Sequence, residues 1–335
     1  MAERFLLVLW LTDRCNLSCK YCYAQAHNHG KNMDVETAKR AIAALRGHPL
    51  KIQFAGGEPL LNLPLALEIC RFTRHEGIDA VFQLQTNATL LTEQTVSQLR
   101  AHRIRVGVSL DGIPPVNSLT RGATDQAVRG IRLLGNPPVG INAVVTDETV
   151  EALPKLVDFA FYLGNVGGIG LDLLRHAGRG TQCREAEPEA LRRAFTAMYR
   201  RSRELQALFG RTVKLREIEL AKKRLAGLGD PRHYCYASCG RSLVVLPEGR
   251  CYPCGSLVSP EFCLGTVDAP RLRPLPRIDR PDCGTCPYVS VCPGGCPSRA
   301  IRNRDDLECI LLKTAFTLAE QELRERNQGG TQECC

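Results

Sequence analysis

The chain is poor in aromatic residues and in long apolar runs. Only 6% of its 335 residues are Phe, Trp or Tyr, and tryptophan occurs once. The apolar run 5–11 is far shorter than the roughly 20 residues that a helix needs to span a bilayer. It continues into Thr12-Asp13-Arg14 without the small residues of a cleavage site. The sequence therefore indicates neither a secretory signal nor membrane attachment, and it predicts a cytoplasmic location.

A concentrated basic stripe is also lacking, although basic residues outnumber acidic ones. The chain has 44 Lys and Arg against 35 Asp and Glu, a formal net charge of +9. The densest basic runs, 200–203 and 222–224, fall in helical patterns, where such charges usually form a solvated face. Proteins that bind nucleic acid commonly interleave a basic patch with aromatic side chains. Binding to nucleic acid is therefore not expected.

Cysteine, in contrast, is abundant, with 17 residues. A chain of this length with 44% hydrophobic residues can bury a core, so it is neither disordered nor dependent on disulfide staples. In a protein that is not exported, clustered cysteines are typical of metal or redox sites. Metal binding is therefore the first hypothesis for the cysteines.

Short apolar patterns alternate with helical patterns over the first two thirds of the chain. The sequence predicts strands at 5–11, 51–55, 79–85, 104–110, 139–145 and 168–174. It predicts helices at 34–46, 63–76, 92–102, 125–134, 149–162, 188–209 and 214–226. Parallel strands with right-handed crossovers curl into a barrel, so the predicted fold class is α/β, a partial (β/α)6 barrel. Functional residues should then lie at the C-terminal ends of the strands.

The character of the chain changes near residue 230. The segment 235–309 holds ten cysteines among many prolines and glycines, and cytosolic segments of this kind are usually held by metal. Within it, Ser242–Leu246 and Arg250–Pro253 predict a β-hairpin. We predict a barrel over 1–230, a small loop-rich cluster domain over 231–310, a C-terminal helix over 311–326 and a disordered tail over 327–335.

Three cysteines, Cys15, Cys19 and Cys22, follow the first predicted strand directly. Thiolates at this spacing can converge on one centre, and three ligands leave one position open, as in an iron–sulfur cluster that also binds a small molecule. The alternative is a structural zinc site completed by His27 or His29. Structural zinc usually uses two C-x2-C pairs, and the strand-end position favours chemistry.

The segment Thr12–Ala24, with Tyr21 before its third cysteine, resembles the cluster loop of radical S-adenosylmethionine (SAM) enzymes. The resemblance implies that Cys15, Cys19 and Cys22 hold a [4Fe–4S] cluster whose fourth iron is chelated by SAM. In that family one electron cleaves SAM to methionine and a 5′-deoxyadenosyl radical. The radical then abstracts hydrogen from a substrate.

Motifs at the next three strand ends support the resemblance. Gly56-Gly57-Glu58-Pro59 matches the family's GGEP, which contacts the SAM amino group: its glycines permit close backbone approach, and Glu58 can pair with an ammonium. Gln85-Thr86-Asn87 resembles TNG with Ala88 in place of glycine, and Ser109-Leu110-Asp111-Gly112 matches a segment whose serine commonly faces SAM. Related enzymes often carry an arginine for the SAM carboxylate where Arg121 stands. The implied SAM-binding residues are Tyr21, Gly56, Gly57, Glu58, Thr86, Asn87, Ser109 and Arg121.

The late cysteines follow a spacing of their own. Cys239-x9-Gly249-x4-Cys254 precedes Cys283-x2-Cys286-x5-Cys292-x3-Cys296 and, after a gap, Cys309. The pattern resembles the SPASM extension of radical SAM enzymes, which binds two auxiliary [4Fe–4S] clusters. The resemblance implies a first auxiliary cluster on Cys235, Cys239, Cys254 and Cys296, with Cys235 as the natural fourth ligand, and a second on Cys283, Cys286, Cys292 and Cys309. A pair of zinc ribbons is the alternative, because Cys283-x2-Cys286 alone is a good zinc knuckle.

Two auxiliary clusters are typical, in the resembled family, of enzymes that modify peptides or proteins. The resemblance implies a ribosomal-peptide maturase that forms a thioether or carbon crosslink, with flavodoxin or ferredoxin as electron donor. A haem-pathway (tetrapyrrole) enzyme and an anaerobic sulfatase-maturase-like enzyme are alternatives, and a non-catalytic iron–sulfur electron carrier is a more distant one. Sulfatase-maturing relatives carry an aspartate base directly after the cysteine that matches Cys254. Gly255 stands there, which argues against a formylglycine-forming reaction.

The substrate side is the least defined part of the sequence. The first strand begins at Phe5, which implies a separate leader-binding protein or recognition of the peptide by the barrel itself. Gln53, Gln83, Asn142 and Asp172 lie on predicted strands and could point into the barrel, but each is equally consistent with a structural role. Arg179, after the sixth strand, lies in a segment that resembles a loop often near substrate. It is the best candidate for a catalytic residue.

Overall fold

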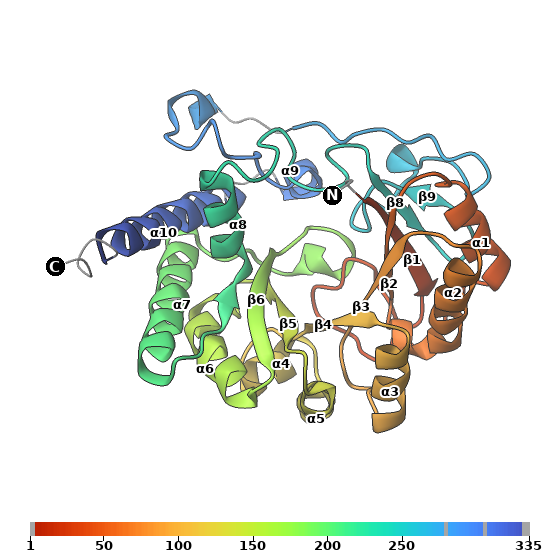
Figure 1. Cartoon of the computed structure of the whole chain (residues 1–335), viewed down its shortest axis with the longest axis horizontal. Helices are drawn as coiled ribbons and strands as arrows, with labels where there is room; N and C mark the ends of the chain where they lie inside the picture. The colour runs from red at the N-terminus through yellow and green to blue at the C-terminus, as the bar shows by residue number, and fades with distance from the viewer. Residues whose placement is uncertain (1–3, 278–280, 304–306, 330–335) are drawn as a thin grey trace.

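The computed structural model describes residues 4–277, 281–303 and 307–329. Within them, one nine-stranded sheet curls through the molecule, with helices on its outer side (Figure 1). The strand order is β7-β6-β5-β4-β3-β2-β1-β8-β9, and every neighbouring pair is parallel except β8 and β9. The strands are β1 Phe5–Thr12, β2 Leu50–Gly56, β3 Ala80–Thr86, β4 Ile104–Ser109, β5 Val139–Val145, β6 Val166–Leu173, β7 Lys214–Leu215, β8 Ser242–Val245 and β9 Cys251–Tyr252.

Helices connect the parallel strands and cover the convex side of the sheet. They are α1 Val35–Ala43, α2 Leu63–His75, α3 Glu93–Ala101, α4 Pro114–Thr120, α5 Thr124–Leu134, α6 Leu153–Leu163, α7 Pro188–Phe209, α8 Arg216–Leu225, α9 Pro297–Asn303 and α10 Leu307–Gly329. Short 3-10 turns lie at Pro59–Asn62, Val150–Ala152, Gly178–Gln182, Pro260–Phe262 and Pro281–Thr285. The predicted α/β fold with an open, parallel barrel is therefore confirmed.

The six predicted strands and the long helices are observed within a few residues of their predicted ends, because the hydrophobic period specified each of them. The two-residue strand β7 and the short helix α4 were not predicted. Neither is long enough to show a period, and α4 begins with two prolines, Pro114 and Pro115. The predicted hairpin is β8 and β9, which pair antiparallel.

Strand β1 is buried on both faces, which explains its unbroken apolar run. Leu7, Leu9 and Leu11 belong to the main core. Val8 and Trp10 point to the other side, into a smaller core that includes residues of β8 and β9. Leu6–Leu9 pairs in register with Ser242–Val245, so the segment after residue 230 extends the barrel sheet beside β1.

The C-terminal helix α10 lies against α7 and α8 (Figure 1). Glu322, only 4% exposed, accepts hydrogen bonds from Lys222 Nζ at 3.2 and 3.3 Å. The helix runs to Gly329, so the first residues of the predicted tail are helical, and the rest of that tail, including Cys334 and Cys335, lies outside the described residues. In the described part of the chain, no helix combines the length and hydropathy of a membrane span.

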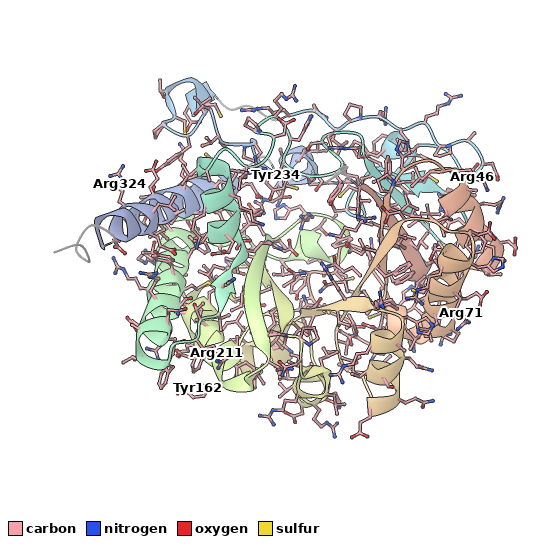
Figure 2. The ribbon with its side chains drawn as sticks, viewed as in Figure 1. Arg46, Arg71, Tyr162, Arg211, Tyr234 and Arg324 are labelled. Carbon is pink, nitrogen blue, oxygen red and sulfur yellow. The ribbon has the colours of Figure 1, made fainter. Side chains whose placement is uncertain are left out.

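Arginines are spread over the rim of the molecule. Arg46, Arg71 and Arg324 are exposed and come from the turn after α1, from α2 and from α10 (Figure 2). The first two lie at the opposite edge of this view from the third.

Candidate functional site

A cavity of about 220 Å³ lies where the parallel strands end. Cys15, Cys19 and Cys22 line it, as do all the other residues of the predicted SAM site and Arg179. Those other residues are Tyr21, Gly56, Gly57, Glu58, Thr86, Asn87, Ser109 and Arg121. A larger hollow of about 580 Å³ lies near the start of β2 and contains no cysteine. The structure thus gathers residues from four strand ends and the loop after β6 around one space.

The loop of the first three cysteines is fixed by backbone contacts and by one arginine. Cys15 N donates to His27 O at 2.6 Å. Arg179 donates from Nε to Cys19 O at 2.9 Å and from Nη1 to Ala26 O at 3.1 Å, and its backbone N donates to Cys22 O at 3.0 Å. Arg179 therefore holds this loop in position through three hydrogen bonds. This positioning role is separate from the substrate-side role that the sequence suggested.

The two glycines of the GGEP segment allow the loop after β2 to touch the loop after β1. Gly57 N donates to Thr12 O and Glu58 N to Arg14 O, each at 2.8 Å. A Cβ on Gly57 would lie 2.1 Å from Arg14 O, and Gly56 has a φ of +132° that L side chains rarely adopt. Only glycine permits both the approach and the turn.

Glu58 ties the ends of β2 and β3 together from a fully buried position, with 1% exposure. Its carboxylate accepts hydrogen bonds from the Thr86 hydroxyl at 2.6 Å, from Asn87 N at 2.8 Å and from Leu60 N at 3.2 Å. Burial raises the pKa of Glu58 to about 7, although these three donors lower it. The carboxylate that was predicted to meet an ammonium is thus already held by its own chain.

Asp111, which the sequence singled out only as part of a motif, organises the other side of the cavity. It is 0% exposed, and Oδ1 lies 3.0 Å from Arg121 Nε. Oδ2 accepts from the Tyr21 hydroxyl and, at 2.8 Å, from the Thr120 hydroxyl. Burial raises the pKa of Tyr21 well above its ordinary value, so the hydroxyl keeps its proton and donates.

Arg121 is held between this carboxylate and the cysteine loop. Its guanidinium lies 5.3 Å from the centroid of the Tyr21 ring, and Nη1 lies 4.0 Å from Cys19 Sγ. A buried cation against a ligand-type sulfur stabilises the thiolate form. Arg121 therefore faces Cys19 as well as the space predicted for SAM.

The loop after β3 reaches the same cysteine loop. Asn87 Nδ2 donates to Asn16 Oδ1 at 3.0 Å and lies 4.0 Å from Cys15 Sγ. Ala88, which stands where the resembled family has glycine, has a φ of +64°. The backbone thus keeps the left-handed conformation that glycine would provide, in a residue that adopts it at a steric cost.

The donor set fits an anionic metal cluster. Burial raises the pKa of the Cys15 thiol to about 11, so without a metal this thiol stays protonated. Metal binding requires thiolates and supplies the positive charge that stabilises them. Arg179 Nη2 and Arg175 Nε are buried beside this cavity without a hydrogen-bond partner in the described residues, which leaves positive groups for an anionic occupant.

Neither histidine of the zinc alternative lines this cavity. The rings of His27 and His29 stack on each other with centroids 4.0 Å apart. Across the ranges that the structure describes, no three His, Cys, Asp or Glu side chains form a group that could hold a single metal ion.

The four cysteines predicted for the second auxiliary cluster line one small cavity of about 30 Å³. They are Cys283, Cys286, Cys292 and Cys309. Burial raises the pKa of Cys292, and the thiols of Cys286 and Cys283 raise it further because they are close. Tyr288 and Phe316, which stack with centroids 5.0 Å apart, also line the cavity. Residues far apart in sequence, on a loop and on α10, therefore converge here.

The cysteines predicted for the first auxiliary cluster are brought together in part. Cys254 Sγ lies 3.3 Å from Ser256 Oγ, Cys296 Sγ lies 3.3 Å from Ser298 Oγ, and the two serine hydroxyls are 2.9 Å apart. Burial raises the pKa of the Cys235 thiol to about 11, and the nearby thiols of Cys296 and Cys254 contribute to this rise. Cys239 instead contacts Arg241 Nε at 3.4 Å and the Tyr236 carbonyl at 3.3 Å.

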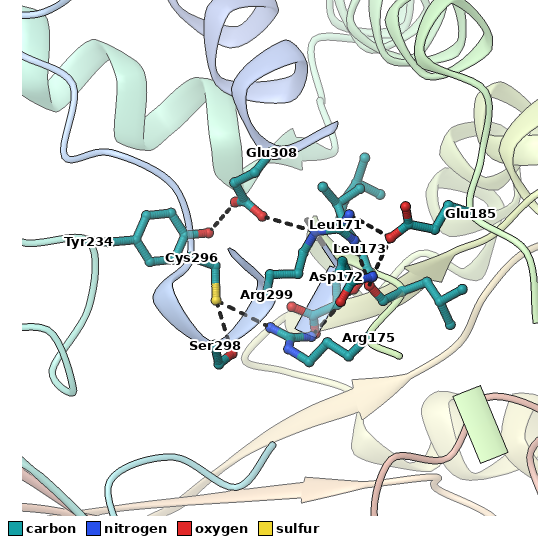
Figure 3. Close-up of polar contacts among 12 residues, drawn as sticks. Leu171, Asp172, Leu173, Arg175, Glu185, Tyr234, Cys296, Ser298, Arg299 and Glu308 are labelled. Atoms are coloured by element: carbon teal, nitrogen blue, oxygen red, sulfur yellow. Dashed lines mark hydrogen bonds and ion pairs between the residues drawn. The ribbon is translucent and has the colours of Figure 1, made fainter. Parts of the chain in front are cut away.

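Arg175, which the sequence analysis missed, connects the two cysteine regions. It lines the main cavity, and Nη2 lies 3.9 Å from Cys296 Sγ (Figure 3). Close by, Arg299 is 2% exposed and joins Glu185 at 2.7 Å, while Glu308 accepts from Tyr234 at 2.5 Å (Figure 3). The only sequence signal for Arg175 was its position just after a strand end.

Comparison with known proteins agrees with this arrangement. Residues 11–160 match the family described as the Radical SAM superfamily. Over 289 residues the chain is 32% identical to an uncharacterized protein of Methanocaldococcus jannaschii, covering 83% of this chain and 93% of that protein. It is 29% identical to the AdoMet-dependent heme synthase of Methanosarcina barkeri, covering 88% and 91%. It is also 29% identical to the serine-type anaerobic sulfatase-maturating enzyme of Klebsiella aerogenes, covering 85% and 77%.

Two solved structures share the fold over most of the chain. Native anSMEcpe with bound AdoMet and Cp18Cys peptide superposes with a TM-score of 0.79 at 22% identity, covering 97% of this chain and 98% of that one. SuiB of Streptococcus suis bound to the precursor peptide SuiA superposes with a TM-score of 0.67 at 17% identity, covering 92% and 76%.

Proposed function

The chain belongs to the radical SAM superfamily, and from that premise we propose that it cleaves SAM reductively and abstracts hydrogen from a peptide substrate. The observation that carries the proposal is the cavity lined by the three cysteines together with residues from the motifs at the next three strand ends. Bound to Cys15, Cys19 and Cys22, a [4Fe–4S] cluster would supply the electron for SAM cleavage. We assign Tyr21, Gly56, Gly57, Glu58, Thr86, Asn87, Ser109 and Arg121 to the SAM site.

The chain's own residues set the conditions for that chemistry. Arg179 and the backbone bonds from Gly57 N to Thr12 O and from Glu58 N to Arg14 O fix the cysteine loop, which holds the three thiols in place for a cluster. Arg121, pinned by Asp111, holds a positive charge against Cys19. Glu58 locks the ends of β2 and β3, which orients the Asn87 amide toward the cysteine loop.

We further propose that the late cysteines hold two auxiliary [4Fe–4S] clusters in a domain over 231–310, after a barrel over 1–230. The shared cavity of Cys283, Cys286, Cys292 and Cys309 supports the second cluster directly. The effect of Cys254 and Cys296 on the pKa of Cys235, and the Ser256–Ser298 hydrogen bond that links Cys254 to Cys296, support the first, and Cys239 completes it by resemblance. Flavodoxin or ferredoxin would deliver electrons, and a separate leader-binding protein is a candidate partner.

A peptide substrate is favoured because two fold neighbours were solved with peptides, anSMEcpe with Cp18Cys and SuiB with SuiA. We therefore propose a ribosomal-peptide maturase. A formylglycine-forming reaction is disfavoured because Gly255 has no carboxylate to act as a base. The position faces Tyr23 and Trp10: a Cβ on Gly255 would lie 3.7 Å from the Tyr23 hydroxyl. The position that carries the aspartate base in sulfatase-maturing relatives thus has no side chain.

A tetrapyrrole substrate is the second candidate. It rests on the likeness to the heme synthase of Methanosarcina barkeri, which extends over 91% of that protein's length. A reaction on a tetrapyrrole would use the same hydrogen abstraction, so the cavity alone does not separate the two substrates.

The test compares deuterated substrates under anaerobic, reducing conditions. Reconstituted protein is incubated with SAM and either deuterated peptides encoded beside its gene or a deuterated haem-precursor porphyrin. Deuterium in 5′-deoxyadenosine from the peptide supports the maturase, whereas deuterium from the porphyrin alone refutes it. Iron should approach about twelve atoms per chain, four for each of three clusters, and a limit of about four would refute the auxiliary clusters.

A further inference from the structure

A row of hydrogen-bonded side chains crosses the inner face of the sheet and ends at Ser109. We call this row, made of Arg216, Asn142, Gln85 and Ser109, the polar ladder. Arg216 Nη1 donates to Asn142 Oδ1 at 3.1 Å, Asn142 Nδ2 donates to Gln85 Oε1 at 3.1 Å, and Gln85 Nε2 donates to Ser109 Oγ at 3.1 Å. The last three residues line the main cavity, and Arg216 lies outside it.

Arg216, at the start of α8, is fixed from several sides. Nε donates to Glu217 Oε1 at 2.9 Å, and Nη2 donates to the carbonyl of Leu171 on β6. Glu217 is itself 8% exposed and also accepts from Leu171 N at 3.0 Å. The Arg216 guanidinium lies directly against Gly170 on β6. A Cβ on Gly170 would lie only 2.5 Å from Arg216 Cζ, so the guanidinium fits there because Gly170 has no side chain.

The chemistry of arginine sets the direction of every bond in the ladder. A guanidinium can only donate, so Asn142 must present its oxygen to Arg216 and its NH2 group to Gln85. Gln85 must then accept with its oxygen and donate with its NH2 group to Ser109. Because Ser109 Oγ already accepts this bond, its own hydrogen is free to be donated into the cavity.

A glycine on β4 makes room for this arrangement. A Cβ on Gly107 would lie 2.4 Å from Gln85 Oε1, so any larger residue there would push the amide out of the row. The ladder thus depends on two glycines, Gly107 under Gln85 and Gly170 under Arg216, which the motifs of the family resemblance did not include.

We propose that Arg216 is a positioning residue that makes the Ser109 hydroxyl a hydrogen-bond donor toward SAM. The inference rests on the proposed SAM site and goes beyond it by specifying that the SAM atom beside Ser109 is a hydrogen-bond acceptor. Arg216 acts from outside the cavity, through two amides whose orientation it fixes. Groups that can only donate would be rejected at this point, because two donors would then face each other.

The test is a double-mutant cycle on SAM binding, measured at equilibrium on anaerobically reconstituted protein. Asn142→Asp puts an acceptor at both ends of residue 142, so Gln85 must turn its NH2 group toward it and its oxygen toward Ser109. The Ser109 hydrogen is then used internally. Both Asn142→Asp and Ser109→Ala should weaken SAM binding by roughly three- to tenfold, the value of one neutral hydrogen bond.

The double variant should bind SAM no more weakly than Ser109→Ala alone, because both changes remove the same bond. The matched control is Gln94→Glu, an amide-to-acid change at an exposed position of α3 away from the main cavity, which should leave the affinity unchanged. Iron content verifies that each variant is loaded. Unchanged affinity in Asn142→Asp, or additive losses in the double variant, would overturn the inference. If the wild-type protein itself does not bind SAM, the proposed function fails instead.

Discussion

Replacing Gly57 by alanine tests the contact that joins the first two strand ends. The new Cβ would lie 2.1 Å from Arg14 O, whereas Cβ atoms essentially never approach another heavy atom within 3.0 Å. The two loops must therefore separate by about 0.9 Å, which breaks the bonds from Gly57 N to Thr12 O and from Glu58 N to Arg14 O. The cysteine loop that contains Cys15 would move with them.

The expected loss can be worked out from these contacts. Two backbone hydrogen bonds contribute about 1 kcal/mol each, and overpacking costs about 1–3 kcal/mol. The free energy of unfolding, from denaturant titration of the reconstituted protein, should fall by about 3–5 kcal/mol. Iron bound at the first site should fall as well, because a ligand shifted by this distance no longer meets the cluster.

Gly140→Ala is the matched control for this change. Gly140 lies on strand β5, where a Cβ would meet nothing within 4 Å. It should change the free energy of unfolding by no more than about 0.5 kcal/mol. Equal stability and equal iron content for Gly57→Ala and Gly140→Ala would refute the reasoning about the contact.

Three further changes test the remaining parts of the site. Asp111→Asn leaves the buried Arg121 without its charge partner and should destabilise the protein by about 3–5 kcal/mol. Glu148→Gln, which breaks the exposed ion pair with Lys20, should cost less than about 1 kcal/mol. Equal denaturation midpoints for the two variants would contradict this expectation. Burial raises the pKa of Glu58 from 4.5 to about 7, so its contribution to stability is complete below pH 4.5 and is lost as the pH rises through 7. The stability of Glu58→Gln relative to wild type should therefore rise by about 3 kcal/mol between pH 5 and pH 8, and a flat difference would refute the buried carboxylate. The described residues of the segment 254–296 form no helix or strand beyond two short 3-10 turns, so iron chelation should expose it to limited proteolysis; an unchanged cleavage pattern would argue against cluster ligation there.

The sequence predicted the barrel because each strand and helix carries its own period. Leu7, Leu9 and Leu11 alternate with Val8 and Trp10, and both sets are buried, so the first strand stood out as an unbroken apolar run. The pairing of β8 with β1 could not be predicted in the same way. It joins segments more than 200 residues apart, and nothing in a local pattern specifies its partner.

The candidate site was predicted to the extent that short motifs carried it. The residues that the resemblance assigned to the cluster and to SAM all line the cavity, because parallel strands end on one edge. Contacts between motifs were missed: the pairing of Asp111 with Arg121 depends on how the loop after β4 folds back. Arg175 and Arg216 were missed because isolated arginines have no spacing signal, and only the curvature of the sheet brings them to Cys296 and Asn142.

The account depends most directly on SAM cleavage at the first three cysteines. The decisive measurement is 5′-deoxyadenosine formed from SAM by the reconstituted, dithionite-reduced protein, by Cys15→Ala and by Cys70→Ala. Cys70 is a fully buried core cysteine on α2 and serves as the matched control. The account predicts 5′-deoxyadenosine from the wild type and from any Cys70→Ala protein that folds, and none from Cys15→Ala. A wild-type protein that binds iron but forms no 5′-deoxyadenosine, or equal formation by Cys15→Ala, would contradict it.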